Sequence, residues 1–235
     1  MPRRGTGRRG RGGVGVTIMI GCPVQNRAHT LPDYLHHIYS LDYPKQELHL
    51  SFLVNGPQLD STTDIILEYI DEYGDEYAHV SYGELYSSYT DSRTGKRDYD
   101  YIAKIRNIWL TFARDTDTHI FSVDSDILIP RHTLNQLLIY DDAIISCLVK
   151  NHHNIPVYNI MIKDNNRYKH IQPDGGVMEV DVTGAAYLTP KGAIDSGVRY
   201  GYHEQGEDVY FCEEAKRRGY RILSDTSIEA VHLLG

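Results

Sequence analysis

Apolar runs of strand length alternate with amphipathic runs along the first part of the chain. Val16 to Gly21 and Leu48 to Val54 have the length and apolar content of strands. Leu31 to Ser40 and the segment around 65–70 instead place their apolar residues at helical spacing. The order strand, helix, strand, helix predicts a parallel sheet with right-handed crossovers.

The same kinds of pattern continue towards the end of the chain. We expect further helices near 102–112, 131–140 and 207–218, and further strands at 119–123, 143–149, 177–182, 221–223 and 228–231. Gly219 follows the last helix, in the position that a C-cap glycine prefers. Residues 150–176 have no clear period and are expected to form hairpins or a long loop. For a chain of 235 residues, this pattern favours one α/β domain.

Two aspartates one residue apart interrupt a late apolar run. Asp124 and Asp126 lie in FSVDSDILIP, and residues i and i+2 of an extended segment point the same way. The same spacing occurs elsewhere in the chain, but only this pair is flanked on both sides by strand-like apolar residues. Because two buried carboxylates without a partner are costly, the pair indicates a hard divalent cation, Mg2+ or Mn2+, or a strong basic partner. A capped turn is the alternative.

Polar residues follow three of the predicted strands. They are the segment from Pro23 to Arg27, Asn55, and the aspartate pair. Ligands of parallel α/β sheets bind beyond the carboxyl ends of the strands. The three clusters are therefore expected to share one pocket.

Charge is unevenly distributed between a basic start and an acidic remainder. The chain has a net charge of -8, yet Met1 to Gly13 contains five arginines and no acidic residue. Its Gly-rich, apolar-poor composition predicts a disordered basic arm over 1–14, ahead of a folded domain over 15–235. Such an arm is suited to nucleic acid, an anionic surface or the acidic body of the protein itself.

The cysteines and the hydropathy bear on the compartment. Cys22, Cys147 and Cys212 are far apart and have neither disulfide-type nor zinc-type spacing, which favours a reducing, cytoplasmic environment. No apolar run approaches the roughly 20 residues that a transmembrane helix needs. The arginine-rich start resembles a signal peptide only in part, because no convincing cleavage site follows it.

Several ordered motifs together resemble the GT-A fold glycosyltransferases, especially family 2-like inverting enzymes that use nucleotide sugars. The resemblance covers most of residues 16–232. It rests on the motifs PVQNR, VNG, KIRN, VDSD, DVTGAA and GEDVYFCEEAKRRGY. It implies one GT-A domain with a mostly parallel central sheet flanked by helices, made of a Rossmann-like nucleotide-binding half and an acceptor-binding half. It also implies a metal-dependent transferase whose donor is a nucleoside-diphosphate sugar, with a UDP-sugar favoured.

The resemblance implies metal ligands. Asp124 and Asp126 would be the pair that holds Mn2+ or Mg2+ at the donor diphosphate. Asp126 would coordinate directly, and Asp124 would contact the ribose or the waters of the ion. His232 follows the last predicted strand, where many similar enzymes place a third ligand. A lone histidine among apolar residues is also often simply packed in a core.

The same resemblance implies the catalytic base and the donor contacts. Asp208 would take the proton of the acceptor hydroxyl, and Glu207 would hold acceptor hydroxyls, although which of the two is the base stays open. At a helix N-terminus both acids are also ordinary. The remaining predicted donor-site residues are Pro23, Gln25, Arg27 and Asn55 near the nucleoside, Lys104 or Arg106 at the phosphates, and Gly184 beside the sugar.

Other classes of protein share parts of this pattern. A nucleotidyltransferase has a similar sheet and carboxylate pair, but it would normally carry a Gly-rich phosphate loop after the first strand, and none follows it here. A non-catalytic module would keep the fold to recognise carbohydrate or nucleic acid. A glycosyltransferase acting on a glycan, a protein or modified DNA, with the basic arm contacting phosphates, combines the two classes.

Overall fold

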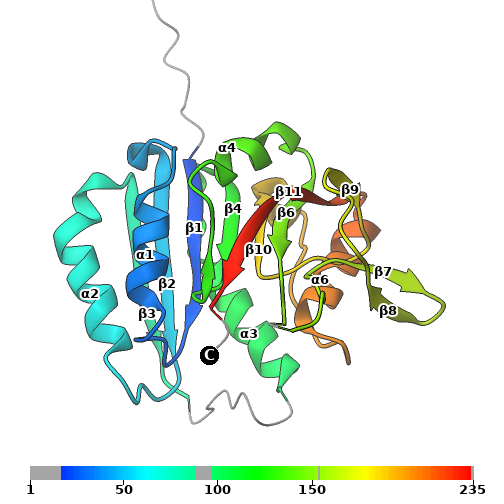
Figure 1. The fold of residues 1–235 in the computed structure, drawn as a ribbon. Helices are drawn as coiled ribbons and strands as arrows, with labels where there is room; N and C mark the ends of the chain where they lie inside the picture. Colours follow the sequence, from blue (N-terminus) through cyan, green and yellow to red (C-terminus); the bar gives the residue numbers. More distant parts are fainter. Residues whose placement is uncertain (1–16, 88–96, 153, 234–235) are drawn as a thin grey trace, which may run out of the picture.

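The computed structural model describes residues 17–87, 97–152 and 154–233, which form one α/β domain (Figure 1). Its main sheet has the order β3-β2-β1-β4-β10-β6-β11-β5, and β9 pairs with β11. The strands of this sheet are β1 (Thr17–Val24), β2 (Leu48–Asn55), β3 (His79–Leu85), β4 (Asp117–Val123), β5 (Ile127–Leu128), β6 (Ile144–Val149), β9 (Val177–Glu179), β10 (Ala186–Pro190) and β11 (Ile222–His232). A separate hairpin, β7 (Met161–Asp164) and β8 (Arg167–His170), projects to one side (Figure 1).

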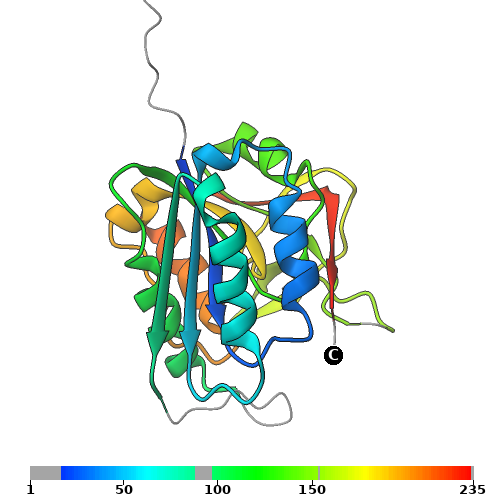
Figure 2. The same ribbon diagram turned by 90° about the vertical axis from the view of Figure 1, so that its left-hand side faces the viewer.

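Helices cover both faces of the sheet. The α-helices are α1 (Leu31–Tyr39), α2 (Thr62–Tyr73), α3 (Tyr99–Leu110), α4 (Thr133–Leu137), α5 (Lys191–Asp195) and α6 (Glu207–Arg217), and the 3-10 turns are Lys45–Glu47, Gly74–Glu76 and Leu138–Tyr140. Helices α1 and α2 lie together over one face (Figure 2). Because side chains alternate along a strand, Ile18 and Ile20 of β1 pack on the α1 and α2 side, whereas Met19 packs on the side of Trp109 in α3.

The sheet has a parallel half and a mixed half. Strands β3, β2, β1 and β4 are parallel, as the alternation of strands and helices predicts. Strand β10 then runs antiparallel between β4 and β6, and β6 is parallel to β11. The first half therefore gathers the carboxyl ends of its strands at one edge, and β10 brings a returning segment to the same edge.

Most predicted elements are confirmed, with corrections at their ends. Strand β1 continues to Val24, so Pro23 lies within the strand and not in the loop after it. The predicted strands at 221–223 and 228–231 are one strand, β11, with an irregular register between Asp225 and Glu229. The predicted strand at 177–182 is shortened to β9, and the helix at 131–140 divides into α4 and a 3-10 turn.

Strands β3, β5 and β10 of the main sheet were not predicted, and one predicted segment cannot be compared. Strand β3 is an edge strand whose residues are mostly half-buried, so its sequence has weak alternation. Strand β10 is short and ends in Pro190. The basic arm over 1–14 lies outside the described residues.

Two other expectations concern the membrane and the cysteines. Within the described part of the chain, no helix combines the length and the apolar character needed to span a bilayer. Cys22, Cys147 and Cys212 are all buried and free.

Candidate active site

A cavity of about 610 Å³ opens at the carboxyl ends of β1, β2 and β4. It brings together all of the site residues predicted from the sequence except Lys104. The predicted residues that line it are Pro23, Gln25, Arg27, Asn55, Arg106, Asp124, Asp126, Gly184, Glu207, Asp208 and His232. Lys104 is on the exposed face of α3, where its ammonium pairs with Asp100, one turn earlier. Residues two apart on a helix point in different directions, which explains why Arg106 reaches the cavity and Lys104 does not.

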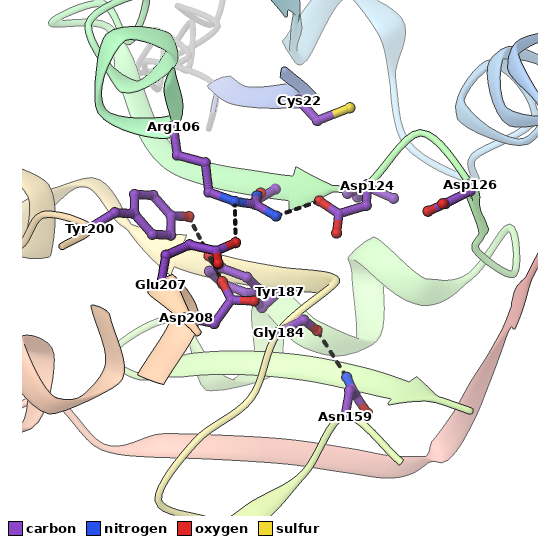
Figure 3. Close-up of polar contacts among 12 residues, drawn as sticks. Cys22, Arg106, Asp124, Asp126, Asn159, Gly184, Tyr187, Tyr200, Glu207 and Asp208 are labelled. Atoms are coloured by element: carbon purple, nitrogen blue, oxygen red, sulfur yellow. Dashed lines mark hydrogen bonds and ion pairs between the residues drawn. The ribbon is translucent and has the colours of Figure 1, made fainter. Parts of the chain in front are cut away.

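Arg106 occupies the centre of the polar wall of the cavity (Figure 3). Its Nη2 donates to Oδ1 of Asp124 at 2.9 Å, and its Nε donates to Oε1 of Glu207 at 3.1 Å. Its Nη1 donates to Oγ of Ser122 at 3.4 Å, and only 7% of the residue is exposed. A charged side chain this deeply buried requires such partners. The carboxylates at the end of β4 and the start of α6 are thus joined through one guanidinium.

Asp208 has the electrostatic properties of a proton acceptor. It lies in the first turn of α6, and burial, followed by the negative charge of Glu207, raises its pKa from 3.8 to about 7. Arg106 and a hydrogen bond from the Tyr187 hydroxyl, 3.2 Å from Oδ1, act in the opposite direction on this pKa. The Tyr187 hydroxyl also contacts that of Tyr200 (Figure 3). A carboxylate with a pKa near 7 is suited to general base catalysis at neutral pH.

Gly184 packs directly against Asp208. A Cβ built on Gly184 would lie 2.5 Å from Oδ2 of Asp208, which is closer than real Cβ atoms approach. The sequence predicts that Gly184 lies beside the sugar. In the structure, the group that leaves no room for a side chain at this position is the carboxylate of Asp208. The carbonyl of Gly184 accepts a hydrogen bond of 3.0 Å from Nδ2 of Asn159 (Figure 3).

Asn159 is a site residue that the sequence prediction missed. Its amide lines the cavity, donates to the Cys147 carbonyl at 3.0 Å and accepts from the Val149 N–H at 2.8 Å, so it ties the end of β6 to the Gly184 loop. The residue is 5% exposed. A polar residue inside the apolar run VYNIMI was the available signal, since a buried amide must find partners.

Asp126 and His232 face each other on the other side of Asp124. Oδ2 of Asp126 is 3.8 Å from Nε2 of His232 and 3.8 Å from Nε of Arg27, both longer than a hydrogen bond. The other ring nitrogen of His232, Nδ1, is buried without a hydrogen-bond partner among the described residues. His232 is the last residue of β11, and the next N–H, of Leu233, donates to the carbonyl of Asp126 at 2.8 Å.

These groups fit a divalent cation as a partial set of ligands. In the described part of the chain, no three His, Cys, Asp or Glu side chains already form a closed metal cluster. Asp126 nevertheless places a carboxylate 3.8 Å from the imidazole of His232, whose Nδ1 is buried without a hydrogen-bond partner among the described residues. Asp124 lies beside them, but one of its oxygens is taken by Arg106. A cation such as Mg2+ commonly uses one or two carboxylates and completes its shell with water and substrate phosphates.

The loop after β1 forms one end of the cavity. Asn26 has a φ of 51°, and its Oδ1 accepts from the N–H of Leu59 at 2.7 Å. The N–H of Arg27 donates to Oγ1 of Thr62 at 2.6 Å. The start of α2 therefore fixes this loop, and Gln25 and Arg27 are held at the cavity beside Asn55.

Solved structures with this architecture define the class of fold. TarS from S. aureus in complex with UDP aligns with a TM-score of 0.62 over 92% of this chain and 60% of that one, at 17% identity. The mannosyltransferase PcManGT from Pyrobaculum calidifontis, in complex with GDP-Man and Mn2+, aligns with a TM-score of 0.61 over 94% of this chain and 57% of that one, at 15% identity. The fold is that of the GT-A glycosyltransferases.

Sequence comparison then gives the family. The family model described as glycosyltransferase family 25, N-terminal domain, matches residues 15–188, and the chain belongs to this family. The GT-A assignment is confirmed, and the matching family model is that of family 25. The match includes Asp124, Asp126 and Gly184, whereas Glu207 and the residues after it lie beyond its end.

The curated relatives include proteins named as galactosyltransferases and proteins named as inactive. Procollagen galactosyltransferase 1-A of Xenopus laevis is 28% identical over 138 residues, which are 55% of this chain and 22% of that protein. The probable inactive glycosyltransferase 25 family member 3 of Bos taurus is 31% identical over 131 residues, which are 52% of this chain and 22% of that protein. The chain thus spans about a fifth of the length of these relatives.

Proposed function

We propose that this chain transfers a sugar from a nucleoside-diphosphate sugar to an acceptor hydroxyl, with inversion, and uses a divalent cation. The observation that carries the proposal is the placement of Asp208, with a pKa of about 7, in the same cavity as Asp126 and His232. Transfer needs a group that takes a proton and a region that accepts the negative charge of the leaving diphosphate. One cavity provides both.

The donor is proposed to bind along β1, β2 and β4. Gln25, Arg27 and Asn55 form the nucleoside end, and Asp126 with His232 would hold Mn2+ or Mg2+ beside the diphosphate, with Asp124 next to them. The bound ion would supply Lewis-acid stabilisation of the leaving group. A UDP-sugar is the favoured donor. TarS was solved in complex with UDP and PcManGT in complex with GDP-Man, and the Xenopus laevis relative is named a galactosyltransferase.

Asp208 is proposed as the general base. Glu207 is the weaker candidate, because its carboxylate is ion-paired with Arg106 and is 7% exposed. Tyr187 orients Asp208 by donating to Oδ1. Inversion goes with this role, because a base that takes the proton of the acceptor hydroxyl on the face opposite the leaving diphosphate allows a single displacement.

A non-catalytic carbohydrate-binding module is the second candidate. The observation in its favour is the similarity to family members that are named inactive. The two candidates differ in turnover, since a binding module would bind a nucleotide sugar without hydrolysing or transferring it.

Donor hydrolysis tests the proposal. We would incubate the protein and Mn2+ with UDP-galactose, UDP-GlcNAc and GDP-mannose and measure the nucleoside diphosphate released, with and without candidate acceptors. We expect turnover of one donor that is lost in Asp126→Ala and on removal of divalent metal, and retained in Arg131→Gln, which changes an exposed ion pair. Turnover that persists without any divalent metal contradicts metal dependence. The anomeric configuration of the product, read by NMR, tests inversion.

A further inference from the structure

Arg106 contacts carboxylates from both halves of the proposed site. Asp124 belongs to the end of β4 on the donor side, and Glu207 begins α6, the helix that carries Asp208. The two contacts, of 2.9 Å and 3.1 Å, use different nitrogens of one planar guanidinium. Because that group is rigid, the two carboxylates cannot move independently while both contacts are kept.

The donors of Arg106 are directed at the protein. Nη1 is aimed at Ser122, and the ring of Tyr200 lies 5.5 Å from the guanidinium carbon. The side chain of Arg106 is only 9% exposed. A phosphate ligand would need N–H groups aimed into the cavity, but three nitrogens of this side chain already have acceptors in the wall. This arrangement differs from the predicted contact with donor phosphates.

Arg106 also places a positive charge beside the proposed cation site. Arg106 is paired with Asp124. Asp126, two residues further along the chain, faces His232. Charges of equal sign repel across a few ångströms, more strongly in a partly buried site than in water. Arg106 therefore opposes the binding of a cation next to Asp124 while it fixes the position of that carboxylate.

We propose that Arg106 is a positioning residue that holds Asp124 and Glu207 in one arrangement, without binding the donor phosphates. It thereby fixes the position of the donor side of the cavity relative to α6, the helix that carries Asp208. Its effect on turnover rests on the proposed function. Its effects on metal and nucleotide binding rest only on the proposed cation and nucleotide sites, and they are measured without turnover. Glu207 immediately precedes Asp208. The contact from Arg106 therefore fixes the first turn of α6, from which the side chain of Asp208 extends.

The test is the variant Arg106→Gln, with metal and nucleotide binding measured separately. Titration of the metal-free protein with Mn2+ should show binding about tenfold tighter than in the wild type, because a competing positive charge is removed. UDP binding without metal should stay within about threefold. Turnover should fall about 100-fold at an unchanged donor KM, as expected for displaced catalytic groups. Loss of a phosphate ligand or simple loss of folding predicts no tightening of Mn2+ binding.

Two further variants complete the experiment. Arg131→Gln, which removes an arginine from an exposed pair with Asp42, should leave all three measurements unchanged. Arg106→Lys is the variant to use if Arg106→Gln does not fold, because it keeps the buried charge. An ammonium cannot span both carboxylates, so turnover should still fall at least tenfold. The proposal is overturned by unchanged or weaker Mn2+ binding in Arg106→Gln, by UDP binding weakened more than tenfold, or by full turnover in Arg106→Lys. Absence of turnover in the wild type would reject the proposed function, while the Mn2+ and UDP titrations would still test Arg106.

Discussion

The carboxylate of Asp208 occupies the space that the missing side chain of Gly184 leaves. A Cβ on Gly184 would lie 2.5 Å from Oδ2 and 3.1 Å from Cγ of Asp208. The clash is with a side chain, and the backbone of Gly184 is not among those with a positive φ. The position of the proposed base is therefore set by a residue of the loop before β10, as well as by its own helix.

Gly184→Ala should displace Asp208 and slow turnover. A shift of about 1 Å in a catalytic group can lower the rate about 100-fold, so we expect kcat to fall by about that factor while UDP affinity stays within threefold. Steady-state kinetics with the preferred donor and UDP titration would check this. Gly192→Ala is the matched control, because its added Cβ would meet only the Tyr220 hydroxyl, at 3.4 Å. Unchanged kcat in Gly184→Ala would contradict the proposed role of Asp208.

The raised pKa of Asp208 predicts a pH-dependent effect on stability. In the folded protein this pKa is about 7, against an ordinary value of 3.8, so the native state binds a proton between these values that the unfolded chain has released. Ionised Asp208 thus destabilises the native state above pH 7, and this loss disappears as the pH falls towards 4. Asp208→Asn, which stays neutral, should be more stable than the wild type at pH 8 and nearly equal to it at pH 4. Urea unfolding at the two pH values measures the difference, and Asp71→Asn on the exposed face of α2 serves as the control.

Removal of the Tyr187 hydroxyl should shift the pH dependence of turnover. The hydrogen bond from Tyr187 lowers the pKa of Asp208, so Tyr187→Phe raises that pKa, and the base is protonated up to a higher pH. We expect kcat/KM to fall about fivefold below pH 7, a factor that corresponds to the loss of one hydrogen bond of about 1 kcal/mol. At pH 8.5, kcat/KM should recover towards the wild-type value. Tyr39→Phe, which loses an exposed contact with Glu76, should show no shift. A uniform loss at every pH would indicate that the hydroxyl acts in some other way.

His232→Ala should weaken metal binding. The ring offers one nitrogen to Asp126 across 3.8 Å and has a second one buried without a partner among the described residues. Groups that only support metal ligands typically change affinity about tenfold or more when mutated, so a direct ligand should have at least that effect. Titration of the metal-free protein with Mn2+ would measure it, with the exposed His36→Ala as control. Equal Mn2+ affinity in the two variants would show that His232 is not a metal ligand.

A buried pair far from these groups should control stability alone. Nδ1 of His49 lies 2.8 Å from Oδ2 of Asp117, both side chains are fully buried, and Nε2 of His49 lies 2.8 Å from Oγ of Ser81. The contacts tie β2, β3 and β4 together near the amino ends of β2 and β4. Asp117→Ala leaves the histidine without its partner and should reduce the free energy of unfolding by about 3 kcal/mol, measured in urea. UDP affinity should not change. Arg131→Ala, in an exposed pair, should cost less than about 1 kcal/mol.

The sequence predicts the parallel half of this fold better than the mixed half. In β1, β2 and β4, continuous burial produces apolar runs that are easy to recognise, and their carboxyl ends determine where the residues of the proposed donor site gather. Strands β3 and β10 lack such a signal, because one is a half-buried edge and the other is short. Their positions depend on long-range pairing.

The sequence also identifies the members of the site better than their contacts. Spacing on α3 indicates that Lys104 and Arg106 point in different directions, but not which of them is buried. The partners of Arg106 come from β4 and α6, which only the packed structure brings together. In the same way, nothing in DVTGAA shows that Gly184 meets Asp208. Side-chain contacts between distant segments carry no local pattern.

Strands β4 and β10 are hydrogen-bonded neighbours in the sheet, with Val123 opposite Ala186, and the N–H of Asp124 donates to the carbonyl of Ala185 at 2.8 Å. Asp124 and the loop that supports the proposed base are thus separated by one strand spacing of about 4.8 Å, which the backbone determines. Asn159 supports the Gly184 loop, whereas the β7–β8 hairpin that follows it in the chain contributes neither group. Met161 and His170 of that hairpin line the cavity, so exchanges there would reshape one of its walls while the distance between Asp124 and the Gly184 loop stays constant. The hairpin is therefore the place where the choice of the proposed acceptor could be varied by evolution or by design.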